Sequence, residues 1–206
     1  MSSSKRNRSI EFFDSQFRQQ IRRQDYQLNP FETQALSFLK GTVLDLGCGL
    51  GNLSLEAGRR GHQVLAVDAS RAAVERVNHD AAREGLPVKA VQADISSWSI
   101  DQSYDTIVAI GLLMFMRRRQ AIRLLDSILE HVRLGGRVVL NVLIQGTTYM
   151  EMFDTDDYYL FPPDEIEKHL VGWQILLSRR DTFPAPSGTT KEFITVIAEK
   201  PGCRGS

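Results

Sequence analysis

The stretch Val43-Leu44-Asp45-Leu46-Gly47-Cys48-Gly49-Leu50-Gly51-Asn52 decides the fold of this chain. An apolar run that favours a buried strand leads into three glycines at alternate positions, and a helical pattern begins directly after them. Glycine lets the backbone turn sharply and lets a ligand approach it without meeting side chains. The free N–H groups at the start of the next helix attract a negative or polar group. The stretch therefore predicts the cradle of a nucleotide-like cofactor.

Two residues of this stretch bear on which cofactor is bound. The dinucleotide fingerprint Gly-x-Gly-x-x-Gly needs a third glycine where this chain has Asn52. Asp45 places a carboxylate two positions before the first glycine. A pyrophosphate gains nothing from that carboxylate, whereas a ligand with a cationic end is attracted by it. An NAD-dependent oxidoreductase is therefore disfavoured and is kept only as an alternative.

The same stretch resembles motif I of the class I S-adenosylmethionine (SAM) methyltransferases, in which an acid and alternate glycines follow an apolar strand. The resemblance implies methyl transfer (EC 2.1.1), SAM as the cofactor and a Rossmann-like fold. It also implies that the cofactor contacts Asp45, Gly47, Cys48, Gly49 and Gly51. Because Cys48 stands between two glycines, we interpret it as a small space-filling side chain rather than a nucleophile.

Strand and helix patterns alternate after residue 42. Parallel strands are expected at 42–46, 63–67, 88–92, 104–110 and 137–143, and two closing strands at 173–177 and 191–198. The expected helices are one that starts at Asn52, one that Ser70 caps and Gly85 ends, a long one that ends at Leu134-Gly135-Gly136, and one opened by Pro162. The order predicts an α/β fold with a doubly wound, Rossmann-like, seven-stranded sheet, mostly parallel with a C-terminal antiparallel hairpin.

An acid also follows the second expected strand. Asp68 comes directly after Val67, and a carboxylate at this place can accept both hydrogen bonds of a ribose diol. The alternative is that Asp68 belongs to the start of the next helix, but Ser70 is already available as the cap. We favour the ribose role for Asp68, with Ala69 beside the cofactor.

The ends of the third and fourth strands complete the expected site. In the resemblance, Asp94 meets the exocyclic amine of adenine, and the backbone N–H of Ile95 meets a ring nitrogen. Asp94 taken alone is equally well explained as a turn residue before two serines. Ile110 and Gly111 stand where the family lets the methionine end pass close to the backbone.

Length and composition limit the domain organisation and the partners that this chain can have. The 206 residues, 42% of them hydrophobic, predict one domain over 10–200, with a helical lid at 10–39 and an insertion at 146–161. Residues 1–9 are expected to be a disordered basic arm, and 201–206 a tail. Lys+Arg and Asp+Glu are equal at 25 each, so no nucleic-acid partner is expected. No apolar segment reaches the roughly 18 residues of a membrane helix, and we expect a cytoplasmic protein of undetermined oligomeric state.

The insertion is the candidate acceptor region. Its aromatic and thioether side chains suit an apolar or soft substrate, and the candidate contacts are Tyr149, Tyr158 and Tyr159 together with Phe115. Its acids Asp154, Asp156 and Asp157 either keep the loop solvated, which we favour, or attract a cation. The four histidines show no metal-ligand spacing, so no metal is expected.

Short motifs suggest a subgroup. Leu112–Met116, Asn29-Pro30-Phe31 and Leu134-Gly135-Gly136 resemble the tellurite-resistance (tellurite/thiol) methyltransferases. That group carries a His-Arg pair between the last two strands, and Asp181–Gly188 of this chain holds no histidine, which speaks against tellurite. The expected activity is methyl transfer to a small-molecule acceptor, a thiol or a chalcogen oxyanion. No catalytic base is assigned, and a non-catalytic SAM-binding or scaffold protein is the alternative.

Overall fold

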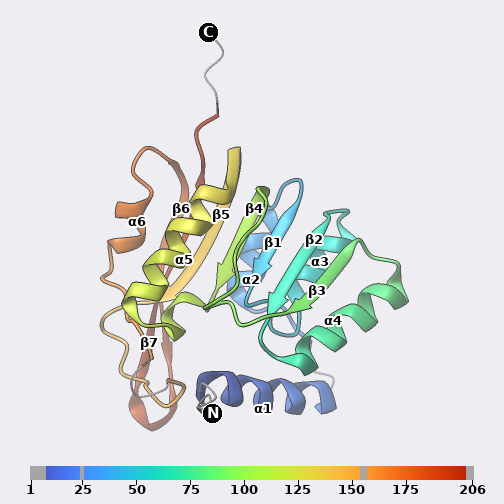
Figure 1. Cartoon of the computed structure of the whole chain (residues 1–206). Coiled ribbons are helices and arrows are strands. Elements are labelled where there is room, and N and C mark those ends of the chain that lie inside the picture. The colour runs from blue at the N-terminus through green and yellow to red at the C-terminus, as the bar shows by residue number, and fades with distance from the viewer. Residues whose placement is uncertain (1–7, 24–25, 154–156, 203–206) are drawn as a thin grey trace, which may run out of the picture.

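The computed structural model describes residues 8–23, 26–153 and 157–202 (Figure 1). The strands are β1 Val43–Leu46, β2 Val64–Asp68, β3 Val88–Gln92, β4 Tyr104–Ile110, β5 Val132–Leu143, β6 Gln174–Pro184 and β7 Thr190–Glu199. The α-helices are α1 Arg8–Arg23, α2 Pro30–Ala35, α3 Asn52–Arg59, α4 Arg71–Glu84, α5 Arg118–His131 and α6 Glu165–His169, with short 3-10 turns η1 Leu36–Phe38, η2 Leu113–Phe115 and η3 Pro186–Gly188.

The described strands form one seven-stranded sheet in the order β3-β2-β1-β4-β5-β7-β6. The first five strands are parallel, and β7 runs antiparallel to both β5 and β6. The chain therefore starts at β1 in the middle of the sheet, moves to one edge at β3, and then returns to β4 on the other side of β1. This order confirms the doubly wound sheet with its C-terminal hairpin.

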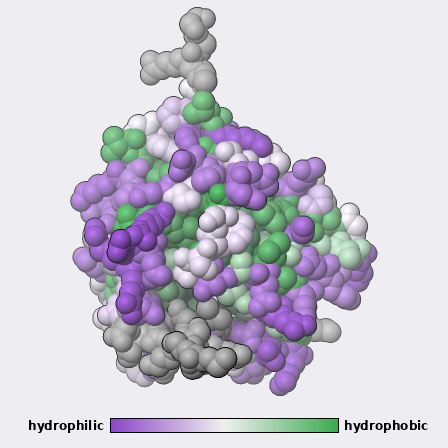
Figure 2. Space-filling model, viewed as in Figure 1, coloured by the Kyte–Doolittle hydropathy of each residue, from purple (hydrophilic) through white to green (hydrophobic). Residues whose placement is uncertain are grey.

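Helices cover both faces of the sheet. On one face, α2 and α3 pack on alternate residues of the central strands, with Val43, Val108 and Val139 fully or almost fully buried. The other face carries α5 and α6, whose apolar side chains bury Ile107 and Leu140. A strand covered on both faces has to be apolar at nearly every position, which explains the continuous apolar run of β4. Figure 2 shows hydrophilic residues over most of the viewed face, with smaller hydrophobic areas between them.

Local signals set several helix ends, among them the predicted cap Ser70 and the predicted stop Gly85. Asn29 caps α2, with Glu32 completing a capping box, and the side chain of Ser70 accepts a hydrogen bond from the N–H of Ala73 at the start of α4. Gly85 ends α4 in the left-handed conformation at a φ of 65°.

The predicted end of the long helix is wrong. The helix α5 ends at His131, and β5 begins at Val132 and runs through Gly135 and Gly136. The backbone of Val132 pairs with Tyr104 of β4, so sheet hydrogen bonds replace the next helical turn. The ammonium group of Lys200 donates to the carbonyls of Leu129, Glu130 and Val132, which satisfies the end of the helix from a distant part of the chain.

Other boundaries shift by smaller amounts. The first closing strand was expected at 173–177 but continues to Pro184, because its backbone stays paired with β7 up to Thr190. The helix expected to open at Pro162 begins at Glu165. The expected arm 1–9 overlaps α1, which begins at Arg8, and residues 1–7 lie outside the described residues. Within the described part of the chain, no helix has the length and apolar content needed to cross a bilayer.

Candidate functional site

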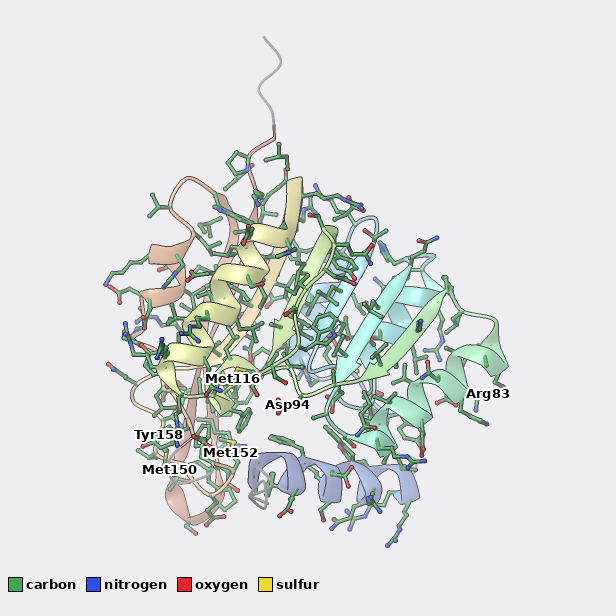
Figure 3. All side chains as sticks on the ribbon, in the orientation of Figure 1. Arg83, Asp94, Met116, Met150, Met152 and Tyr158 are labelled. Carbon is green, nitrogen blue, oxygen red and sulfur yellow. The ribbon has the colours of Figure 1, made fainter. Side chains whose placement is uncertain are left out.

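The predicted site residues gather at the carboxyl edge of the sheet, where the strand order reverses between β1 and β4. In Figure 1, the arrowheads of β1, β2 and β4 point toward α1, which runs across this edge. Ligands of doubly wound sheets bind at this topological switch point. Figure 3 places Asp94 in the space between the strand ends and α1.

The loop after β1 has the conformation that its glycines permit. Gly47, Gly49 and Gly51 have φ angles of 71°, 51° and 70°, which side chains rarely adopt. A Cβ atom on Gly51 would lie 2.3 Å from the side chain of Val77 in α4. The loop is held by the N–H of Gly47, which donates to the carbonyl of Val67 at 2.8 Å. The loop is thus packed on α4 at Gly51, while Gly47 and Gly49 are partly exposed.

Asp68 is held in place by the glycine loop. The N–H of Gly49 donates to one of its carboxylate oxygens and the N–H of Ser70 to the other, both at 2.8 Å. Burial raises the pKa of Asp68, while these backbone bonds act in the opposite direction. Because Ser70 caps α4 with its own side chain, capping does not account for Asp68. Each carboxylate oxygen has a second lone pair, so the group can still accept hydrogen bonds from a diol.

Asp45 is a buried acid directly behind the loop. Its carboxylate accepts a hydrogen bond of 2.6 Å from the hydroxyl of Ser54 in α3. Burial raises its pKa to about 7, and the nearby carboxylates of Glu32 and Asp68 act in the same direction. Burial also raises the pKa of Glu32. Where such desolvated acids are ionised, they create a negative potential that favours a cationic ligand.

Cys48 has the space-filling role that its position suggested. Its side chain is 6% exposed and packs in a cluster with Leu55 and Val77. Burial raises the pKa of its thiol well above the usual value, so the nucleophilic thiolate is disfavoured.

The end of β3 has a different arrangement from the end of β2. Asp94 is exposed, and one of its oxygens accepts hydrogen bonds from the N–H of Ser96 at 3.0 Å and from its hydroxyl at 2.7 Å. This is the turn that was considered as an alternative role for Asp94. The side chain of Ile95 is buried and packs in the main core. The carbonyl of Ala69 accepts from the side chain of Gln92 at 3.1 Å, which joins the ends of β2 and β3.

The exit from β4 lies against the glycine loop. A Cβ atom on Gly47 would be 3.1 Å from the side chain of Leu112, two residues after Ile110. Gly111 adopts a φ of 66°, and its N–H donates to the carbonyl of Asn141 in β5. The structure thus brings the segment that the resemblance assigns to the methionine end of the cofactor next to the glycine loop.

The helix α1 closes over the glycine loop. A Cβ atom on Gly49 would lie 3.1 Å from the ring of Phe17. One turn earlier on α1, the carboxylate of Asp14 accepts a hydrogen bond of 2.6 Å from the hydroxyl of Ser70. Sequence reasoning placed a lid here but missed Asp14, because an acid on an exposed helix face carries no local signal of its partner.

A chain of aromatic rings joins α1 to the insertion. The ring of Phe13 contacts Phe115 edge-to-face at 4.9 Å, Phe115 contacts Phe153 at 5.1 Å, and Phe153 stacks on Tyr158 at 5.0 Å. The hydroxyl of Ser9 donates to the carbonyl of Met152. Figure 3 shows Met150, Met152 and Tyr158 gathered near one end of α1, with Met116 above them. Asp154 and Asp156 lie outside the described residues.

The other predicted acceptor residues have different polar partners, although Tyr149 packs against the same apolar cluster as Phe115. The hydroxyl of Tyr159 donates to the buried carboxylate of Glu165, and Arg118 bonds to both groups. Tyr149 lies under the ammonium group of Lys191, which is 4.7 Å from its ring centroid. The aromatic chain therefore includes Phe115 and Tyr158 but not Tyr149 or Tyr159.

Comparison with known proteins agrees with this geometry. Residues 43–136 match the family model of a methyltransferase domain. The chain is 31% identical over 175 residues to hemagglutinin 1 of Eikenella corrodens, covering 78% of this chain and 55% of that protein. It is 27% identical over 141 residues to the probable SAM-dependent methyltransferase TehB of Haemophilus influenzae, covering 65% of this chain and 46% of that protein. The chain spans about half the length of these curated relatives.

Solved structures show the same fold. The crystal structure of TehB from Haemophilus influenzae has a TM-score of 0.73 at 21% identity, over 84% of this chain and 62% of that one. The N-methyltransferase NodS from Bradyrhizobium japonicum, solved in complex with S-adenosylhomocysteine (SAH), has a TM-score of 0.70 at 15% identity, over 95% of this chain and 100% of that one. The expected fold class and the resemblance to the class I SAM-dependent methyltransferases and the TehB group are confirmed, and NodS, solved with SAH, is similar in fold to this chain.

Proposed function

We propose that this chain, which has the fold and glycine loop of the class I SAM-dependent methyltransferases, transfers a methyl group from SAM to a small-molecule acceptor. The observation that carries the proposal is the carboxylate of Asp68, which two backbone N–H groups hold beside the glycine loop, with the buried acid Asp45 behind that loop. A carboxylate fixed by two backbone N–H groups suits a ribose diol, and a desolvated acid suits a cationic methionine end.

The residues that hold the cofactor have separate tasks. Asp68 accepts from the ribose hydroxyls, and the backbone of Gly47 and Gly49 lets the ligand approach closely. Asp45 balances the positive charge at the methionine end from behind the loop. The backbone at Gly111 borders the same end, across from Gly47, as the contact through Leu112 indicates. Asp94, at the end of β3, is proposed to face the adenine end of the cofactor.

The chemistry places few demands on the protein. SAM supplies a methyl group that its sulfonium already activates. The protein has to align the acceptor in line with that methyl group and keep water out, which needs orientation more than a strong base. The lid α1 and the aromatic chain of the insertion provide this enclosure, since they close the carboxyl edge of the sheet from outside.

The surroundings favour a neutral or soft acceptor, such as a thiol, over a chalcogen oxyanion. Aromatic rings and methionine side chains line the contact between α1 and the insertion. Two arginines near it are already paired, Arg117 with Asp157 and Arg118 with Glu165, and the ammonium group of Lys191 lies over the ring of Tyr149. An oxyanion would have to compete with these carboxylates, whereas a polarisable sulfur contacts aromatic rings favourably.

Calorimetry and a turnover assay test the proposal. Wild-type protein should bind SAM and SAH, should not bind NAD, and should form SAH with at least one member of a panel of thiols, tellurite, selenite and small amines. The Asp68→Asn variant is the control that separates specific cofactor binding from assay background. Binding of NAD in preference to SAM would contradict the proposal. SAM binding without SAH formation from any acceptor would instead support a non-catalytic SAM-binding protein.

A further inference from the structure

One arginine of α4 contacts the glycine loop from its outer side. The guanidinium of Arg76 donates to the carbonyl of Leu50 and, at 3.0 Å, to the side-chain oxygen of Asn52. These two acceptors stand on either side of Gly51, which is the N-cap of α3. The side chain of Arg76 is only 11% exposed, and it also bonds to Asp80 at 3.1 Å. Arg76 thus holds the loop at the point where the helix facing the cofactor begins.

The same guanidinium contacts the segment that leads from the lid. Arg76 lies over the ring of Tyr26 at 3.7 Å from the ring centroid. Next to it, the side-chain amide of Asn52 donates to the carbonyl of Gln27 at 3.1 Å. Tyr26 in turn donates from its hydroxyl to the carbonyl of Ile21 near the end of α1. One side chain therefore connects the end of the lid helix, the segment after it and the glycine loop.

These contacts border an open hollow rather than a packed interface. The hollow has a volume of about 1200 Å³ and lies between α1 on one side and α3 and α4 on the other. Tyr26, Arg76 and Asn52 all line it. Because this side of the lid borders a hollow rather than a packed core, the contact between Arg76 and Tyr26 is not backed by hydrophobic packing.

We infer that Arg76 is a positioning residue, which holds the glycine loop in its binding conformation and couples that loop to the lid through Tyr26. The inference rests on the proposed function, because the loop is the cofactor loop. Lysine is a poor substitute for arginine here, because the guanidinium donates to Asp80 from Nε and to Leu50 and Asn52 from Nη1 while its flat face lies on the ring of Tyr26, and a compact ammonium has neither the separate nitrogens nor the flat face.

Five variants test the coupling. Arg76→Met and Arg76→Lys remove the guanidinium group. Tyr26→Ala removes the ring on which that group lies, and Tyr26→Phe keeps the ring but removes the hydroxyl. Arg71→Met is the matched control, because Arg71 is on the same helix and its ion pair with Glu75 is exposed. Dissociation constants for SAH, KM for SAM, kcat, melting temperatures and backbone hydrogen exchange are measured for each.

Loss of the contacts of Arg76 with the glycine loop and Tyr26 should weaken cofactor binding more than it slows catalysis. We expect Arg76→Met and Arg76→Lys to raise the dissociation constant of SAH and the KM for SAM about tenfold, with kcat changed less than about twofold. Tyr26→Ala should have a smaller effect of the same kind, and Arg71→Met should resemble wild type. Tyr26→Phe keeps the ring against Arg76 but loses the hydrogen bond to Ile21, so its SAH affinity should lie between those of wild type and Tyr26→Ala. The double variant Arg76→Met/Tyr26→Ala should bind SAH about as well as Arg76→Met alone, because both changes break one linkage.

Two results would overturn the inference. The first is a lower melting temperature in Arg76→Met with SAH affinity like that of wild type, which would give Arg76 a merely structural role. The second is hydrogen exchange at residues 50–52 that does not rise in Tyr26→Ala, which would show that loop and lid are independent. If wild-type protein does not bind SAH at all, the proposed function fails, and the exchange measurement alone still decides whether Arg76 couples the two segments.

Discussion

The hydroxyl of Ser70 donates a hydrogen bond of 2.6 Å to the carboxylate of Asp14, a residue 56 positions earlier in the chain. The same Ser70 caps α4 with its side chain and donates its backbone N–H to Asp68. A single residue therefore joins the lid helix, the start of α4 and the carboxylate proposed to bind ribose. This arrangement explains how a helix at one end of the chain is held across the carboxyl edge of the sheet.

Removing Asp14 should loosen the lid without weakening α4. In Asp14→Ala, we expect faster hydrogen exchange in α1 with little change in α4, because Ser70 keeps its cap. Ser70→Ala should also lower the free energy of unfolding by about 1 kcal/mol, the usual cost of a lost N-cap. Asp14→Asn keeps an acceptor oxygen and should behave like wild type. Equal exchange in α1 for wild type and Asp14→Ala would show that the rings, not this hydrogen bond, hold the lid.

Asp68 should contribute to cofactor binding and not to the fold. We expect Asp68→Asn and Asp68→Ala to weaken SAM and SAH binding by about 1.5–3 kcal/mol, since charge-assisted hydrogen bonds to the diol are lost. Calorimetry gives the affinity, and circular dichroism checks that the fold is retained. Asp164→Asn changes an acid far from the carboxyl edge and serves as the control. Normal SAM affinity in both Asp68 variants would assign Asp68 to the loop structure alone.

Asp45 should make stability depend on pH. Its pKa of about 7 in the folded protein is above that of an unfolded aspartate, so the folded state binds the extra proton between about pH 4 and pH 7. The contribution of Asp45 to the free energy of unfolding is therefore fully present below about pH 4 and is lost as the pH rises through about 7.

The variant Asp45→Asn should remove that dependence. The amide still accepts the hydrogen bond from Ser54 and cannot ionise. Urea unfolding should show the variant gaining ~3–4 kcal/mol relative to wild type between pH 4 and pH 8. At pH 8 the same variant should bind SAM more weakly, because the buried negative charge is absent. Parallel stability curves for the two proteins would mean that Asp45 stays ionised in the folded state.

The two neighbouring tyrosines of the insertion should differ in their effects. Tyr158→Ala should lower turnover more than SAH binding, because Tyr158 ends the chain of rings that reaches α1. Tyr159→Phe should leave turnover intact and lower stability by about 1–2 kcal/mol, since the buried carboxylate of Glu165 loses its hydroxyl partner. Steady-state kinetics and urea unfolding separate the two effects. Similar losses of turnover in both variants would place Tyr159 at the acceptor as well.

The sequence alone determined the fold class and the place of the cofactor loop. Alternating strand and helix patterns, and the glycines and the acid at the first strand, are local features, since each depends only on residues that are close together in the sequence. The cap Ser70 and the acid Asp68 at the end of β2 were predicted for the same reason, because each acts within a few residues of itself. The end of α5 was not, since Val132 is paired by β4 and its carbonyl is satisfied by Lys200.

Only the tertiary structure decided which side chains meet at the site. It pairs Asp14 with Ser70, lays Phe17 on Gly49 and joins Arg76 to both Leu50 and Tyr26. It also separates Tyr158 from Tyr159, although the two are adjacent in the chain. Contacts of this kind depend on where whole helices and loops come to lie in the fold, and a residue on an exposed helix face or a loop carries no local pattern that identifies a partner far away in the sequence.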